Sequence, residues 1–107
     1  AAQALRDAAR AVQAAGADLL VLECVPSPVA ATIQSDLEIP VIGIGAGPHC
    51  DGQILVCYDV IGISPGRRPR FVKNYLSGQD GVLDAFRHYV ADVRSGAFPA
   101  AEHEYAE

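Results

Sequence analysis

The sequence predicts an α/β fold with parallel strands, and three observations support this prediction. Short apolar segments that could form strands alternate with segments whose apolar residues recur at helical spacing. The first two of these short segments are continuously apolar, which is typical of strands that helices cover on both faces. Half of the 107 residues are hydrophobic and 20% are charged, as in globular proteins. We therefore expect one α/β domain at most.

The first helix is expected over residues 2–15, where alanine is abundant and apolar residues recur every three or four positions. Gly16 follows at the position where a left-handed glycine commonly ends a helix. Residues 19–22 are continuously apolar and predict a buried strand, which Glu23 closes. A second helix is expected over residues 28–35 because its apolar residues have helical spacing.

Ser27 and Pro28 open this second helix as its predicted N-cap and first helical residue. A second buried strand is predicted at residues 39–44. A third strand is predicted at residues 54–57, after a turn at residues 51–52.

Residues 58–62 are expected to open another helix, and the last helix is predicted over residues 81–94 with Asp80 as its cap. The apolar residues of this last helix form one stripe, made of Val82, Phe86, Tyr89, Val90 and Val93. Residues 97–107 are acidic and are expected to be loosely ordered unless they dock on another subunit. We therefore assign residues 1–96 to the α/β domain and residues 97–107 to a tail.

The predicted order of elements implies parallel strands joined by right-handed crossovers. Three strands cannot close a barrel, and a parallel sheet of this size would leave two open edges. The pattern therefore fits either a small open α/β sheet or the last third of an eight-stranded barrel. The chain contains no methionine, even at its start, which suggests a piece of a longer protein.

Charge and cysteine content argue against several classes of protein. A net charge of −5 disfavours a nucleic-acid backbone as the main partner. No apolar run approaches the about 20 residues that cross a bilayer. Three cysteines cannot all pair within the chain, and without a secretory signal they indicate a reducing, cytosolic compartment. Cys24 and Cys57 lie in or next to predicted strands, where we expect them to be buried as small hydrophobes.

Glu23 is the first candidate for a catalytic residue. It closes a predicted parallel strand, and the carboxyl ends of such strands carry the active sites of α/β folds. The residues on both sides of it are apolar, so we expect a partly desolvated carboxylate suited to general acid–base chemistry. The alternative is a carboxylate that only marks the exit of the strand into solvent.

Other segments give weaker candidates. The glycines of residues 43–48 fail the G-x-G-x-x-G pattern of dinucleotide sites at Pro48, so tight packing is their expected role. Asp51 is expected to form a turn. The basic segment 67–73 could bind a phosphate or a carboxylate, although a solvated loop is its expected role. No metal site is predicted, because paired zinc spacing is missing among Cys24, His49, Cys50 and Cys57.

Four segments read LLVLECVP, IPVIGIGAGPHCDGQILVCYD, RPRFVKNY and SGAFPAAEHEY. Together they resemble the C-terminal part of the ketopantoate hydroxymethyltransferase family, and the resemblance extends over essentially the whole chain. Its most specific block is GIGAG…CDGQILV. The resemblance implies the C-terminal portion of a (β/α)8 TIM barrel, about strands six to eight with their flanking helices.

The resemblance also implies an activity, the transfer of a hydroxymethyl group from 5,10-methylenetetrahydrofolate to 3-methyl-2-oxobutanoate, giving 2-dehydropantoate in pantothenate biosynthesis. In the family, the glutamate of the LECVP motif, here Glu23, is the proposed proton acceptor, and Mg²⁺ stabilises an enolate. The metal and substrate ligands belong to the N-terminal half of the barrel, so the fragment alone is expected to be inactive. The family is cytoplasmic and usually homodecameric.

Two other functions remain open from the residues. One is a small, non-catalytic α/β ligand-binding module whose glycine loop contacts the ligand. The other is a carbon–carbon lyase of the phosphoenolpyruvate-type barrels, which also use Mg²⁺ and enolates. The GIGAG…CDGQILV block disfavours the lyase.

Overall fold

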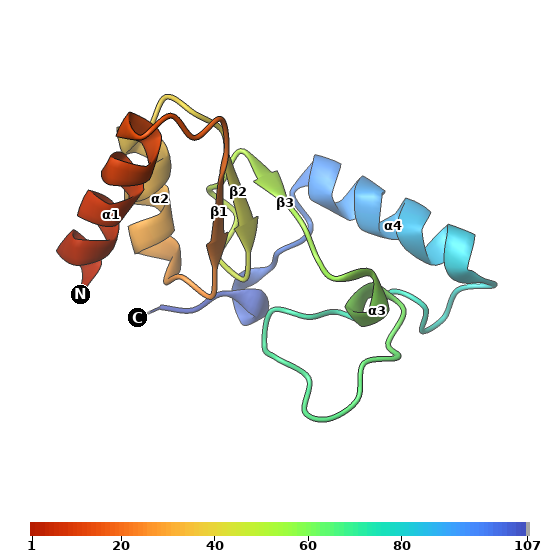
Figure 1. Cartoon of the computed structure of the whole chain (residues 1–107). Helices are drawn as coiled ribbons and strands as arrows, with labels where there is room; N and C mark the ends of the chain where they lie inside the picture. The colour runs from red at the N-terminus through yellow and green to blue at the C-terminus, as the bar shows by residue number, and fades with distance from the viewer. Residues whose placement is uncertain (107) are drawn as a thin grey trace.

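The computed structural model describes residues 1–106 as a three-stranded sheet with helices around it (Figure 1). Glu107, the last residue of the expected tail, lies outside the described residues. Among residues 1–106, no helix has the length and apolar character needed to cross a membrane. The elements in chain order are α1 (Ala2–Ala14), β1 (Leu20–Glu23), α2 (Ser27–Asp36), β2 (Val41–Ile44), β3 (Gly52–Gln53), α3 (Cys57–Val60), α4 (Val82–Ser95) and the 3-10 helix η1 (Ala101–His103).

The strands form one parallel sheet in the order β1–β2–β3, which confirms the predicted parallel arrangement. The register between β1 and β2 runs from Leu20 opposite Val41 to Glu23 opposite Ile44. Figure 1 shows α1 and α2 together on one side of β1 and β2, and α4 beyond β3. Within residues 1–106 the sheet is open, because β1 and β3 each pair with β2 alone.

The expected burial of both faces of the first strand is wrong for this chain. Leu22 is buried, but Leu19 and Val21 are 49% and 46% exposed. The cause is that β1 is an edge strand, and none of residues 1–106 covers this side of it. Continuous hydrophobicity therefore identified the strand but not the exposure that it has here.

The predicted third strand at residues 54–57 is also wrong. The observed third strand, β3, contains only Gly52 and Gln53. Its pairing with β2 ends at the amide of Ile54, which donates to the carbonyl of Gly43 at 3.0 Å. The carbonyl of Val56 then accepts the amides of Asp59 and Val60 and so begins α3. The short apolar run is divided between the exit from the sheet and the start of a helix, which apolar character alone cannot distinguish.

The three longer helices are observed within one residue of their predicted ends. Gly16 and Gly96 follow α1 and end α4 with φ of +102° and +82°, in the left-handed region. The predicted caps are wrong, because neither α2 nor α4 has a side-chain cap hydrogen bond. Ser27 is the first residue of α2, and its buried side chain packs against Gly47. The N-cap of α4 is Gly81, one residue after Asp80.

The helices pack through two apolar clusters. The first joins α1 and α2 to β1 and β2 through Ala9, Leu22, Val25, Ala30, Ile33, Val41 and Ala46. The second lies against α4 and contains Val60, Tyr75, Ala85 and Phe98. The hydroxyl of buried Tyr75 donates to the Asp92 carboxylate at 2.8 Å, so this phenol has a partner. Val82 and Val90 of the predicted stripe on α4 are 49% and 42% exposed, and its other residues, Phe86, Tyr89 and Val93, are partly buried against this cluster.

The expectation of a loosely ordered tail is wrong. Phe98 is 4% exposed in the second cluster, and His103 is 9% exposed with its ring 4.9 Å from that of Phe98. Further along, Tyr105 packs against a third cluster that contains Ile44 and Phe71. Acidic composition suggested solvation, but the aromatic residues of the segment anchor it to the domain in the same chain.

We expect the isolated 107-residue chain to self-associate, because Leu19 and Val21 are exposed beside the open edge of β1. Sedimentation at micromolar concentrations measures this association. Val21→Lys should shift the population toward monomer, since a charge at an edge opposes strand pairing between molecules. A monodisperse monomer of the unmodified chain would contradict the expectation.

Candidate active site at the carboxyl ends of the strands

The carboxyl ends of β1 and β2 lie side by side, and the chain turns sharply after each of them. Glu23 ends β1 opposite Ile44, and the next amide, of Cys24, donates to the Ile44 carbonyl at 3.0 Å. Cys24 has φ of +53°, a conformation that a non-glycine residue keeps only where the surrounding structure holds it. The site therefore begins with a carboxylate on a strand end that is fixed by its neighbour's backbone.

The expected desolvation of Glu23 is not observed in this chain, because its side chain is exposed. Of the apolar residues that follow it, Val25 is buried in the first cluster and Cys24 is exposed. Glu23 lines a shallow groove of about 210 Å³ between α1 and β1. The other residues of this groove are all apolar: Leu5, Ala8, Ala9, Val12, Leu20, Val21, Leu22 and Val25.

The C-terminal segment crosses the same end of the sheet. The Ser27 amide, at the start of α2, donates to the Tyr105 carbonyl at 2.8 Å. Arg70 Nη1 donates to the Glu104 carbonyl at 3.2 Å, and its guanidinium lies 5.6 Å from the centre of the Tyr105 ring. Burial raises the pKa of the Tyr105 hydroxyl, and the adjacent Cys24 thiol adds to this effect. The segment thus brings Tyr105 beside the residue that follows Glu23.

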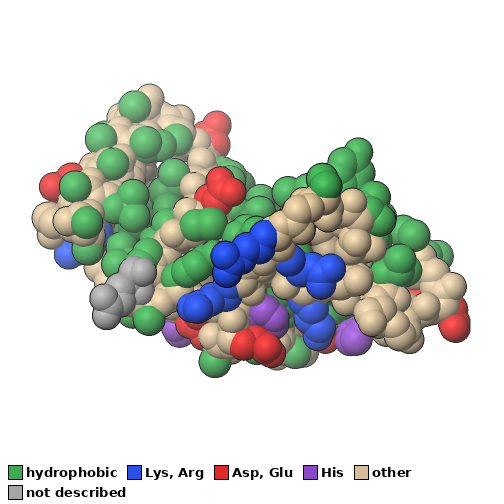
Figure 2. All heavy atoms as spheres, turned by 90° about the horizontal axis from the view of Figure 1, so that it is seen from below, with side chains coloured by type: hydrophobic (Ala, Val, Ile, Leu, Met, Phe, Trp, Pro, Cys, Tyr) green, Lys and Arg blue, Asp and Glu red, His purple; other side chains and the backbone are tan. Residues whose placement is uncertain are grey.

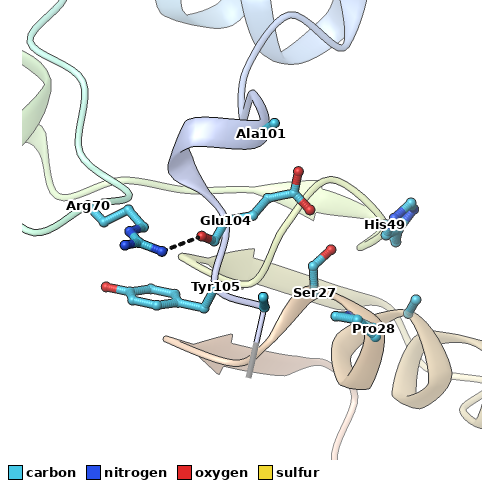
Figure 3. A pocket seen from close by; sticks show the side chains of 9 residues that line it. Ser27, Pro28, His49, Arg70, Ala101, Glu104 and Tyr105 are labelled. Carbon is cyan, nitrogen blue, oxygen red and sulfur yellow. Dashed lines mark hydrogen bonds between the residues drawn. The ribbon is translucent and has the colours of Figure 1, made fainter.

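An open pocket of about 610 Å³ lies between α2 and this segment (Figure 3). Its polar lining comes from elements far apart in the chain, and Figure 3 shows Arg70 beside the Tyr105 ring. The polar lining residues are Ser27, His49, Arg70, Glu104 and Tyr105. Among residues 1–106 no hydrogen bond pairs the Ser27 hydroxyl with a base, so the arrangement suits binding of a polar ligand better than nucleophilic catalysis.

The glycine loop after β2 packs tightly, as expected. Gly45 has φ of +68°, and a Cβ there would lie 2.7 Å from the Phe71 ring. Gly47 has φ of +79°, and a Cβ there would overlap the Ser27 side chain. Both positions combine a left-handed backbone with close neighbours from the same chain, so these glycines serve packing rather than ligand access.

Asp51 lies at the opposite end of the sheet, where the strands begin. Its Oδ2 accepts the Val41 amide at 2.8 Å, and its Oδ1 accepts the Gln34 side-chain amide at 3.0 Å. Both carboxylate oxygens thus join α2, β2 and the start of β3. The expected turn at residues 51–52 is wrong, because Asp51 lies in a bend and Gly52 already belongs to β3.

Cys24 and Cys57 are exposed, so their expected burial is wrong. Cys24 lies beyond the end of β1 in a left-handed turn, and Cys57 begins α3 instead of ending a strand. Within residues 1–106, no group of three His, Cys, Asp or Glu side chains could hold a metal ion. His88 lies on the surface of α4, with 44% of its side chain exposed.

Sequence reasoning missed Tyr105 and the pairing of Arg70 with the C-terminal segment. Both belong to segments that were expected to be solvated. The available signal was aromatic: Phe98 and Tyr105 flank a stretch that has no other large apolar residue, and large aromatic side chains contribute strongly when they are buried.

Residues 1–101 match the ketopantoate hydroxymethyltransferase family. Over 105 residues the chain is 57% identical to 3-methyl-2-oxobutanoate hydroxymethyltransferase from Alkalilimnicola ehrlichii, covering 98% of this chain and 38% of that protein. It is 56% identical over 107 residues to the enzyme of the same name from Xanthomonas euvesicatoria, covering 99% of this chain and 40% of that protein. The chain therefore spans about two fifths of the length of these curated relatives.

We expect the docking of the C-terminal segment to weaken as the pH falls. Burial lowers the pKa of His103 below its ordinary value of 6.5, although the charge of Glu102 opposes this. The docked ring is therefore stable as the neutral form, whose Nδ1 accepts the Ala100 amide at 3.0 Å. Below pH 6.5 a released imidazole gains a proton that the docked one resists, so docking is fully favoured above this pH and weakens progressively below it.

The Ser27 amide reports on this docking, because it donates to Tyr105. Its hydrogen-exchange protection, corrected for intrinsic rates, should fall several-fold between pH 7.5 and pH 5.5. His103→Asn, which cannot gain a proton there, should remove the pH dependence. His88→Asn, on exposed α4, should keep it. The same pH dependence in the His103 variant would contradict this assignment.

Proposed function

Because the chain belongs to the ketopantoate hydroxymethyltransferase family, we propose that it is the C-terminal part of a 3-methyl-2-oxobutanoate hydroxymethyltransferase. The enzyme would transfer a hydroxymethyl group from 5,10-methylenetetrahydrofolate to 3-methyl-2-oxobutanoate and form 2-dehydropantoate, a step of pantothenate biosynthesis. The relatives of that name, 57% and 56% identical over nearly the whole chain, support this proposal. The single structural observation that carries it is a carboxylate, Glu23, at the carboxyl end of a parallel strand.

We place the chain in a (β/α)8 barrel, as its last strands and helices. Such a barrel takes about 250 residues, and the relatives are correspondingly longer than this chain. The open edge of β1 supports the proposal, because a preceding strand would pair there. The exposed side chains of Leu19 and Val21 would then be covered, as strands of a parallel sheet require.

Glu23 is proposed as the group that moves protons. The substrate carbon that forms the new bond lies next to a ketone, so it must lose a proton before it can attack. A carboxylate can accept this proton when it is held within hydrogen-bond reach of that carbon. The backbone around Glu23 is fixed by the β1–β2 ladder and by the turn at Cys24, which gives the carboxylate a defined position.

From the family resemblance we propose Mg²⁺ as cofactor, bound by residues of the N-terminal half of the barrel; residues 1–106 contain no group of three His, Cys, Asp or Glu side chains that could hold a metal ion. We therefore assign no metal ligand and no catalytic step through a metal to this chain. A cytoplasmic homodecamer is proposed from family resemblance alone.

A ligand-binding module with the glycine loop as its contact is not supported. Gly45 packs against Phe71 and Gly47 packs against Ser27, so the backbone of the loop at these positions faces the protein and not a ligand.

The test of the proposal is Glu23→Gln in the full-length protein. We expect kcat to fall by more than about tenfold, because the amide keeps the shape of the carboxylate but cannot accept the proton. Mg²⁺ binding, measured separately, should stay near normal. Glu38→Gln, at an exposed position after α2, is the matched control and should retain turnover. Turnover equal to wild type in the Glu23 variant would remove this residue from the mechanism.

A further inference from the structure

Three arginines, Arg67, Arg68 and Arg70, lie within four residues of the loop between α3 and α4. Together with Pro69 and Tyr105 they line an open pocket of about 530 Å³. Figure 2, viewed from the side toward which β1 and β2 point, shows Lys and Arg side chains gathered near the middle of this face. Positive charge is thus concentrated in a hollow at the carboxyl ends of the strands, in a chain of net charge −5.

These three charges have no acidic partner among residues 1–106. Half of the Lys and Arg residues of the chain do form ion pairs with carboxylates, namely Arg6, Arg10, Lys73 and Arg87. Adjacent unpaired guanidinium groups repel one another, and this repulsion is relieved when an anion binds between them. The loop therefore favours an anionic ligand.

One of the three side chains is already held in position. Arg70 Nη1 donates to the Glu104 carbonyl at 3.2 Å, and its guanidinium lies 5.6 Å from the centre of the Tyr105 ring (Figure 3). A carbonyl and an aromatic ring orient the guanidinium without neutralising its charge, and the remaining N–H donors stay available. Such a fixed fork matches the two oxygens of a carboxylate.

The location of this pocket limits the part of a substrate that it can bind. Arg70 and Tyr105 also line the neighbouring pocket of about 610 Å³, which reaches Ser27. Tyr105 in turn lies beside Cys24, the residue after Glu23. The arginines thus lie near the same end of the sheet as the proposed base, although Glu23 itself lines neither of these two pockets. A long substrate with a reactive group at one end and anionic groups at the other would fit this arrangement.

We propose that Arg67, Arg68 and Arg70, with the Tyr105 ring, bind the carboxylates of the glutamate tail of the folate cosubstrate. This inference rests on the proposed function. 5,10-Methylenetetrahydrofolate carries its one-carbon unit between N5 and N10, near the pterin end, and its two carboxylates at the opposite end. Binding energy from such a remote, non-reacting end can position the reacting end. The small keto acid, with its single carboxylate next to the reacting ketone, would lie beside Glu23 and not among these arginines.

The experiment compares full-length wild type with the double variant Arg67→Gln, Arg68→Gln. Both substituted side chains are exposed, so the fold should be retained, as thermal melting will report. Each protein is assayed with 5,10-methylenetetrahydrofolate and with the pteroate analogue that lacks glutamate. We take kcat/KM for 5,10-methylenetetrahydrofolate divided by kcat/KM for the pteroate analogue. We expect this ratio to fall roughly tenfold in the double variant, as when one charge-assisted carboxylate contact is lost. Arg94→Gln, an exposed arginine on α4, should keep the wild-type ratio.

Calorimetric binding of tetrahydrofolate and tetrahydropteroate gives the same ratio from Kd values, independently of turnover. A wild type that lacks transferase activity but prefers the glutamate-bearing ligand, with this preference lost in the double variant, would overturn the proposed function and keep the anion site. An equal preference in wild type and double variant would overturn the anion site. Inorganic phosphate that competes with the folate cosubstrate only in wild type, alongside an unchanged tail preference, would assign the arginines to free phosphate and also overturn the proposal.

Discussion

Backbone hydrogen bonds between β1 and β2 align the two strands in parallel, from Leu20 opposite Val41 to Glu23 opposite Ile44. Because the strands are parallel, they all leave the sheet at its carboxyl end, so every loop that follows a strand begins at that end. Glu23 and the glycine loop therefore lie at the carboxyl end of the sheet, whereas Asp51 lies at the amino end. The parallel ladder alone therefore places the proposed site and Asp51 at opposite ends of the sheet.

The C-terminal segment depends on the carboxyl end of the sheet and completes it. Two of its attachments use backbone carbonyls, those of Tyr105 and Glu104, which accept the Ser27 amide and Arg70 Nη1. Carbonyl acceptors are present whatever the side chain, so the crossing depends on the path of the segment more than on its acidic residues. Aromatic anchors at Phe98 and Tyr105 set that path by burial. A segment that is acidic in composition is thereby ordered against a cluster of arginines.

Local signals predicted what local interactions determine. Alanine content and apolar spacing placed α1, α2 and α4 within one residue, since helical hydrogen bonds join residues four apart. The predictions for the third strand and the tail were wrong because the structure of these segments depends on distant residues. The Ile54 amide bonds to the Gly43 carbonyl, and the Ser27 amide bonds to the Tyr105 carbonyl. Glu23 was predicted at a strand end, and it is there, but its exposure is set by whatever covers β1 and could not be predicted from its neighbours in sequence.

Glu23 and the exposed apolar side chains of α1 and β1 line the same groove, the one between these two elements. This groove presents Leu5, Val12 and Val21 around a single carboxylate. Apolar side chains that are about half exposed gain on the order of 1 kcal/mol each when they are covered. An element packed on this groove would therefore be held by the hydrophobic effect, and the same contact would remove water from around Glu23. Completion of the sheet and preparation of the proposed base would then be one event, because both require the same surface to be covered.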